Sequence, residues 1–300
     1  MTAVAVRAES VEALSPLAEL LSPVTVDEFL DLLRRREFVY RPQSNADRFA
    51  QTAGWAALQR SIAAGRQPVE RGGIRVTKQS HNVPPDRWMT DGKADIAKLK
   101  AFLADGYSVV ALRIEEHVPE LAAICDEVKA RTGERSFVGA IVTSGVRAGA
   151  FKTHYDPEDL LILQVEGTKR WKVFRPVVPD PVQRMPKTAL ENPELIFDEV
   201  LEPGDMLFVP AGYWHHCESG LSTSVHLGIF FLPPTAWHWI EQTIHPLIND
   251  QFFRKSLTRI TEERGLAGVQ AELKKRLIAK IEELDLEKFV ERWQTPGQET

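Results

Sequence analysis

Six short strand-like segments follow one another between Phe137 and Leu232, and no helix-like segment interrupts them. They are rich in β-branched and aromatic residues and are separated by glycine and proline, as antiparallel strands are. The segments read SFVGAIVTS, DLLILQVEG, KRWKVF, IFDEVL, GDMLFVP and STSVHLGIFF. Parallel strands need long crossovers that are usually helical, so this order predicts an antiparallel sandwich or jelly roll.

Helical patterns flank the β region on both sides. Thr25 and Glu28 are spaced as a capping box before a short helix, and residues 119–132 read as a second helix. We predict a mainly β, α+β protein with N-terminal α/β elements over 1–105, a jelly-roll domain over 106–235 and a helical region over 236–300. In that last region apolar residues recur at helical spacing, namely Leu266, Val269, Leu273, Leu277, Ile278, Ile281 and Leu284.

Charge and cysteine content exclude several classes of function. The chain has 37 Lys and Arg against 42 Asp and Glu, so a net charge of −5 gives no basic surface for nucleic acid. Its two cysteines lack the spacing of a disulfide framework or a zinc knuckle. No apolar run has the length of a signal core or a membrane span. We therefore expect a cytoplasmic protein that binds neither nucleic acid nor a membrane.

Two short motifs contain metal-binding residue types. His154 and Asp156 are two positions apart just before a predicted strand, so their side chains share one face if the segment is extended. Downstream, a PAG turn is followed by His215 and His216, only one of which can face inward from a strand. Two imidazoles and one carboxylate on a β scaffold describe the facial triad of non-haem Fe(II) oxygenases. Alternation alone does not choose between the two adjacent histidines.

These motifs carry a family resemblance. HYDPEDLLILQVEGTKRWKVF and LEPGDMLFVPAGYWHHCES, with STSVHLGIFF, are similar to the JmjC-type cupins, the cupin-like Fe(II)- and 2-oxoglutarate-dependent oxygenases that include the ribosomal oxygenases. The resemblance covers about residues 22 to 232. It implies a double-stranded β-helix core, with His154, Asp156 and His215 as catalytic iron ligands and His216 left with a free role.

The resemblance also implies a site for the co-substrate. In many relatives a basic residue at the start of the strand after the hairpin pairs with the far carboxylate of 2-oxoglutarate, and Lys169 holds that position. Arg170 is the alternative, on the other face of the strand. Ser224 and His226 lie on the strand that closes the jelly roll in relatives, and they are further candidates for cofactor binding.

The function implied is hydroxylation of a C–H bond, with consumption of O₂ and 2-oxoglutarate and release of succinate and CO₂. The same machinery would serve demethylation. Ribosomal oxygenases usually continue with dimerising helices and a winged-helix domain, whereas the 68 residues after Leu232 read as helix. We therefore expect a homodimer through these helices and no winged helix, and a substrate that is a peptide, a free or carrier-bound amino acid, or a small metabolite.

Two alternative functions would use the same metal site. A regulatory or ligand-binding cupin would bind metal without oxygenase turnover and would release no succinate. A different metal-cupin enzyme, such as an isomerase or a dioxygenase without an oxo-acid, would need no role for Lys169 and would add a fourth His or Glu ligand. A serine hydrolase is disfavoured, because Ser222, Ser224 and His226 share one strand face without a nucleophile turn.

Overall fold

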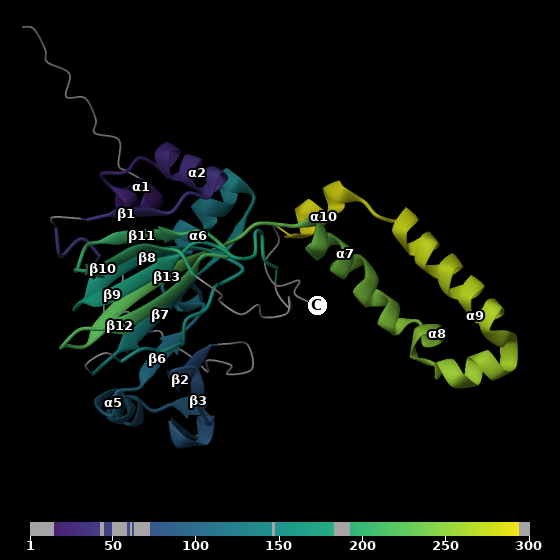
Figure 1. Cartoon of the computed structure of the whole chain (residues 1–300), viewed down its shortest axis with the longest axis horizontal. Helices are drawn as coiled ribbons and strands as arrows, with labels where there is room; N and C mark the ends of the chain where they lie inside the picture. The colour runs from purple at the N-terminus through teal and green to yellow at the C-terminus, as the bar shows by residue number, and fades with distance from the viewer. Residues whose placement is uncertain are drawn as a thin grey trace, which may run out of the picture. The chain divides into compact units, whose positions relative to one another are not determined.

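A computed structural model describes residues 15–42, 45–49, 59–60, 62, 73–145, 148–182 and 193–293 (Figure 1). The chain forms two compact units. One consists of Met1–Thr132 and Ser136–Phe231, and the other of Gly133–Arg135 and Leu232–Thr300. The predicted division at residues 105 and 235 stays a prediction.

The first unit is a jelly roll made of two sheets, which confirms the predicted α+β fold class. The larger sheet has the order β1-β11-β8-β13-β7-β6-β2-β3, and the smaller has the order β10-β9-β12. The larger sheet contains β1 (Val39–Arg41), β2 (Ile74–Lys78), β3 (His81–Val83), β6 (Ser108–Ala111), β7 (Arg135–Thr143), β8 (Asp159–Glu166), β11 (Met206–Val209) and β13 (Ser224–Leu232). The smaller contains β9 (Lys169–Phe174), β10 (Leu195–Leu201) and β12 (Trp214–Ser219).

All six strands predicted between Phe137 and Leu232 are present, and the described part of that region contains one further strand that was not among them. That strand is β12, whose sequence WHHCES is too polar to be read as a strand. It forms because it pairs antiparallel with β9, with His215 opposite Val173 and Ser219 opposite Lys169. The missed strand therefore carries one of the candidate metal ligands.

Helices cover the outer face of the larger sheet. They are α1 (Pro16–Leu21), α2 (Val26–Arg35), α5 (Ile96–Ala104) and α6 (Pro119–Thr132), with 3₁₀ turns at Pro85–Arg87 and Ile114–His117 and a small hairpin of β4 (Met89–Thr90) and β5 (Lys93–Ala94). The predicted capping box is formed, since the Thr25 hydroxyl accepts from the Glu28 amide and the Glu28 carboxylate accepts from the Thr25 amide.

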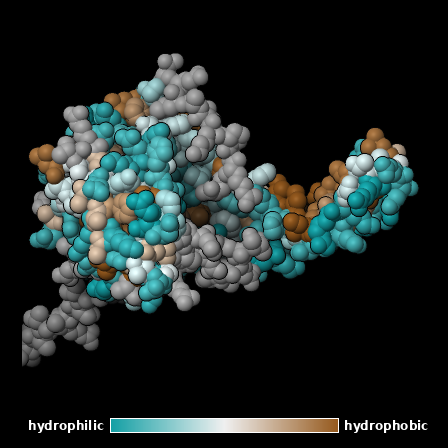
Figure 2. All heavy atoms as spheres, turned by 90° about the horizontal axis from the view of Figure 1, so that it is seen from below, coloured by the Kyte–Doolittle hydropathy of each residue, from teal (hydrophilic) through white to brown (hydrophobic). Residues whose placement is uncertain are grey.

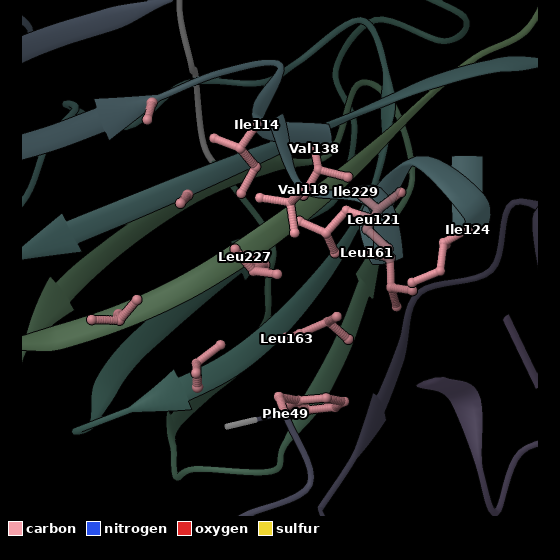
Figure 3. Close-up of a cluster of buried hydrophobic side chains, with 14 of the residues drawn as sticks. Phe49, Ile114, Val118, Leu121, Ile124, Val138, Leu161, Leu163, Leu227 and Ile229 are labelled. Carbon is pink, nitrogen blue, oxygen red and sulfur yellow. The ribbon is translucent and has the colours of Figure 1, made fainter. Parts of the chain in front are cut away.

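The main core lies between this outer face and the helices (Figure 3). Leu161 and Leu163 of β8 and Ile229 of β13 are fully buried there. Leu121 of α6 is fully buried in the same cluster. Each such side chain contributes about 1.5 to 3 kcal/mol by leaving water. This core makes the larger sheet a rigid wall for whatever its inner face binds.

The second unit is helical, as predicted. It contains α7 (Ala236–Ile244), a 3₁₀ turn (His245–Asn249), α8 (Gln251–Arg254), α9 (Leu257–Glu282) and α10 (Leu286–Trp293). The predicted apolar stripe divides in two. Val269 packs with Phe252 and Ile260 in a small core, whereas Leu266, Ile278 and Ile281 are more than half exposed. Within the described residues, no helix has the length and hydropathy needed to cross a membrane.

One buried carboxyl makes the stability of the first unit depend on pH. Glu115 accepts a hydrogen bond from the Val138 amide at 2.8 Å, yet burial raises its pKa to about 7. Glu116 adds to this rise, while the Val138 amide and the Arg113 guanidinium oppose it. The folded state therefore binds the proton more tightly than the unfolded chain does, so stability from this group is full below the unfolded pKa and is lost as pH rises toward 7.

We expect the free energy of unfolding to fall on the order of 2 kcal/mol between about pH 5 and pH 8 on account of Glu115. Glu115→Gln keeps an acceptor for the Val138 amide and should remove this fall. Urea unfolding at the two pH values measures it. Glu116→Gln, at the exposed neighbour, is the control and should keep the wild-type dependence. An unchanged dependence in Glu115→Gln would contradict the assignment.

Candidate metal centre and its cavity

The segment that carries His154 and Asp156 lies beside β12 as a short extra strand. The His154 amide donates to the His215 carbonyl at 3.1 Å, and the His215 amide donates to the His154 carbonyl at 2.7 Å. The Gly212 amide donates to the Asp156 carbonyl at 2.9 Å. Backbone pairing therefore brings two motifs together that are about 60 residues apart in the sequence.

The side chains of His154, Asp156 and His215 converge on one point. One ligand atom from each lies within 4.8 Å of the others. His154 Nε2 is 3.7 Å from Asp156 Oδ1, and His215 Nε2 is 3.6 Å from Asp156 Oδ2. These distances are too long for hydrogen bonds but are suitable for three groups around a shared ion. Among the described residues, this is the only cluster of His, Cys, Asp and Glu with such geometry.

The two imidazoles are held in the tautomer that metal binding needs. His154 Nδ1 lies 2.8 Å from the Lys152 carbonyl, and His215 Nδ1 lies 3.2 Å from the Tyr213 carbonyl. A carbonyl oxygen can only accept a hydrogen bond, so each Nδ1 carries the proton. Each Nε2 is then unprotonated, and its lone pair is available to a metal ion. Burial, followed by the nearby His154, lowers the pKa of His215 to about 4. The donor set and its orientation fit a divalent transition metal.

His216 points away from this point. Its Nε2 lies 3.1 Å from Glu218 Oε1, on the opposite face of β12. His215 is 3% exposed and faces the other two predicted ligands. Of the two adjacent histidines, His215 is therefore the one that faces His154 and Asp156, and its role as the third ligand stays a prediction.

Lys169 is completely buried at the start of β9. Its Nζ donates to Thr143 Oγ1 at 3.0 Å and lies 3.4 Å from His226 Nδ1. No carboxylate of the described chain comes within ion-pair distance of this ammonium, and burial lowers its pKa. Arg170 points outward and pairs with Asp198 at 2.6 Å. The cation on the inner face is therefore Lys169.

The two other predicted cofactor residues differ in their surroundings. His226 lines the cavity next to the metal centre, and burial lowers its pKa well below the ordinary value. Ser224 is buried but lies outside the lining, where its hydroxyl accepts from Gln164 Nε2 at 2.9 Å. The Trp171 ring lies between the two histidines, 5.7 Å from His215 and 5.5 Å from His226 between ring centroids.

The metal centre opens into a cavity of about 860 Å³ between the two sheets. That is at the upper end of the range for small-molecule sites. Trp171 and Cys217 also line the cavity and were not predicted, although each lies two positions along a strand from a predicted residue, Lys169 and His215. Arg75, Phe137 and Phe230 line the opposite wall and were not predicted either. No local pattern marks those three, because only the strand order brings them to the site.

Comparisons with known proteins find a family model and several relatives. Residues 116–239 match the family model of the JmjC domain. The bifunctional lysine-specific demethylase and histidyl-hydroxylase NO66 of Drosophila willistoni is 26% identical over 186 residues, which are 59% of this chain and 23% of that protein. The uncharacterized protein YxbC of Bacillus subtilis (strain 168) is 26% identical over 272 residues, which are 80% of this chain and 78% of YxbC.

Among solved structures, YcfD, a ribosomal oxygenase from Escherichia coli in complex with cobalt and 2-oxoglutarate, is similar with a TM-score of 0.48 and 16% identity. The match covers 74% of this chain and 56% of the YcfD chain. The chain thus spans less than a quarter of the NO66 relative and most of YxbC.

Proposed function

We propose that this chain, whose residues 116–239 match the family model of the JmjC domain, is an Fe(II)- and 2-oxoglutarate-dependent hydroxylase. The balanced reaction is R–H + 2-oxoglutarate + O₂ → R–OH + succinate + CO₂. One observation carries the proposal: the three converging ligands line a cavity that His226 also lines, and the buried ammonium of Lys169 lies 3.4 Å from His226 Nδ1 behind that lining.

His154, Asp156 and His215 would hold Fe(II) on one face. Three protein ligands leave the other coordination positions for 2-oxoglutarate and O₂, as in other facial-triad oxygenases. Bound there, the iron and its co-substrate supply the oxidising power that an unactivated C–H bond requires. The Lys152 and Tyr213 carbonyls keep both Nε2 atoms directed at the metal. A fourth His, Cys, Asp or Glu ligand is absent from the described cluster, which disfavours a four-ligand cupin enzyme.

Lys169 would bind the distal carboxylate of 2-oxoglutarate. A buried ammonium without a counter-ion is costly, and a carboxylate that reaches it forms a charge-assisted hydrogen bond in a low-dielectric site. Lys169 and His215 lie on adjacent strands, four residue pairs apart along the β9–β12 ladder. Four pairs correspond to about 13 Å between the backbones along the strand, and both long side chains shorten that span. His226 lies between the two regions, since its Nδ1 is 3.4 Å from Lys169 Nζ and the residue lines the cavity with the metal ligands.

Hydroxylation, rather than demethylation, is the reaction we propose. The substrate is a peptide, an amino acid or a small metabolite, and the name of a relative from Rattus norvegicus, ribosomal oxygenase 2, adds ribosomal protein to the candidates. We further propose a cytoplasmic enzyme without a nucleic-acid partner, in line with its net charge of −5.

Succinate release tests the function. The purified chain is incubated with Fe(II), 2-oxoglutarate and O₂, and succinate is measured by mass spectrometry as candidate substrates are added. We expect slow succinate formation alone and faster formation with a substrate, at one succinate per hydroxyl group. Iron and 2-oxoglutarate binding without any succinate would favour the alternative, a regulatory or ligand-binding cupin.

The homodimer is proposed on the exposed apolar residues of the helical unit (Figure 2). Nine of the thirteen exposed large hydrophobic residues of the described chain belong to it, from Trp237 to Leu286. Surfaces of this kind mark interfaces in soluble proteins. We expect Ile278→Glu with Ile281→Glu to convert a dimer to a monomer in light scattering after gel filtration. Leu221→Glu, at an 88% exposed site on the first unit, is the control. A monomeric wild type would contradict the dimer.

A further inference from the structure

Two cationic residues, Arg75 and Lys152, line the cavity, and the side chain of Arg75 has no role in the chemistry described so far. Arg75 lies on β2, on the wall opposite the metal ligands. Its neighbours Ile74 and Val76 are buried in the core behind the sheet. Strand alternation therefore directs the Arg75 side chain inward. The residue is half-buried, so its guanidinium is neither in bulk water nor inside the core.

Strand register places Arg75 at a different level of the sheet from Lys169. Arg75 pairs with Val110, and Val110 pairs with Ile141. Two residues further along these strands, Thr77 pairs with Ser108 and Ser108 with Thr143, whose hydroxyl binds Lys169. Arg75 is therefore about 7 Å along the strands from the level of Lys169. The two cations cannot serve one small carboxylate.

The guanidinium of Arg75 has no hydrogen bond or ion pair with any residue that the structure describes. Most other arginines of the first unit are engaged: Arg36 pairs with Asp159, Arg170 with Asp198 and Arg175 with Glu194. The wall around Arg75 is apolar, because Val110, Leu112 and Ile141 line it. A charge beside such a wall attracts an opposite charge more strongly than it would in water.

The far end of this wall is aromatic. The rings of Phe137 and Phe230 are stacked, with centroids 4.5 Å apart and planes 5° apart, and both line the cavity. Gly228, the next inward position to Phe230 on β13, also lines it. A Cβ there would come within 2.9 Å of Leu160 Cδ1 and 3.1 Å of the Phe230 ring. The wall therefore offers one cationic fork and a flat apolar surface.

We propose that Arg75 is a specificity residue that binds a carboxylate of the substrate to be oxidised. The planar guanidinium matches a carboxylate with two parallel hydrogen bonds. The apolar part of the substrate would lie along Val110, Ile141 and Phe137, and its reacting C–H would face the metal centre. The substrate class is then a carboxylic acid with an apolar body, either a small free acid such as an amino acid or an acidic residue of a peptide. This inference rests on the proposed oxygenase function.

Binding, rather than turnover, tests this inference. The full chain is loaded with Zn(II) and 2-oxoglutarate, which supports no oxidation, and titrated by calorimetry and ligand-observed NMR. The probes are the apolar and acidic L-amino acids with their amides, N-acetyl-L-leucine with N-acetyl-L-leucinamide, and a doubly capped peptide containing one glutamate with its glutamine analogue. Preference for the free acids identifies a small acid, and preference for the glutamate peptide identifies a peptide substrate.

We expect at least one acid to bind about 10- to 100-fold more tightly than its neutral partner. Arg75→Met should abolish this preference and Arg75→Lys should keep part of it. Both should leave 2-oxoglutarate affinity unchanged. Arg175→Met removes the same charge outside the cavity and should behave as wild type.

The inference is overturned if no acid binds better than its neutral partner, or if the preference survives in Arg75→Met. A wild-type chain that fails to bind 2-oxoglutarate overturns the oxygenase instead. The acid preference measured with Zn(II) alone then still decides the role of Arg75.

Discussion

We expect the variants His154→Ala and Asp156→Ala, which each remove one predicted metal ligand, to lose both bound iron and turnover. Loss of a residue that only orients a metal ligand already lowers metal affinity about 10- to 100-fold, so loss of a ligand itself should exceed about 100-fold. His215→Ala should have the same effect, because its Nε2 completes the cluster. Metal content after desalting and Fe(II) affinity by competition with a chelator measure the change.

His216→Ala is the matched control for the triad. It removes the same side chain from the adjacent position of β12, but its imidazole faces Glu218 on the opposite side of the strand. We expect wild-type iron content and wild-type 2-oxoglutarate binding. If His216→Ala lost the metal and His215→Ala kept it, the assignment of the third ligand would be wrong. Circular dichroism of each variant separates loss of metal from loss of fold.

The second large effect is expected for Lys169→Met, which should weaken 2-oxoglutarate binding while stabilising the metal-free protein. Without the ammonium, the distal carboxylate is buried unpaired, which should lower affinity on the order of 100-fold. Methionine fills a similar volume without a buried charge. Thr143 loses one donor but keeps its hydroxyl contact with Ser108 at 3.0 Å. We therefore expect a gain in stability on the order of 1 kcal/mol.

The combination of weaker 2-oxoglutarate binding and higher stability distinguishes a binding residue from a structural one. A lysine kept only for the fold would give a destabilised variant with normal affinity. Arg170→Met is the matched control, since the adjacent side chain carries the same charge but is exposed and paired with Asp198. It should leave 2-oxoglutarate affinity unchanged. Calorimetric titration with 2-oxoglutarate and thermal unfolding of the metal-free proteins give both quantities.

Much of the fold and of the site follows from local sequence pattern. Alternating apolar residues and turn signals predict the strands, because a strand buries one face and must reverse at its end. His-x-Asp predicts two ligands on one face for the same reason. Family resemblance, rather than spacing, favours His215 over His216. In the structure, β12 turns only His215 toward His154 and Asp156.

The features that could not be predicted depend on the order of the strands in the sheets and on how deeply each side chain is buried. Nothing local distinguishes Lys169 from an exposed hairpin lysine, and its burial arises because β9 lies between β10 and β12 with Thr143 opposite. Arg75 is about 80 residues before the first metal motif and about 140 before the second, and it reaches the cavity only because β2 joins the sheet beside β6. The apolar stripe of α9 likewise divides into buried and exposed parts through contacts with α8.

The most direct test of the proposed oxygenase is an anaerobic titration of the metal-free protein with Fe(II) and then 2-oxoglutarate, followed by visible absorption. Chelation of Fe(II) by 2-oxoglutarate gives a weak charge-transfer band. We expect that band in the wild type, its loss in His154→Ala, and its appearance in Lys169→Met only at much higher 2-oxoglutarate concentration. Tight iron binding by the wild type with no band at any 2-oxoglutarate concentration would contradict the oxygenase and leave a metal-binding cupin.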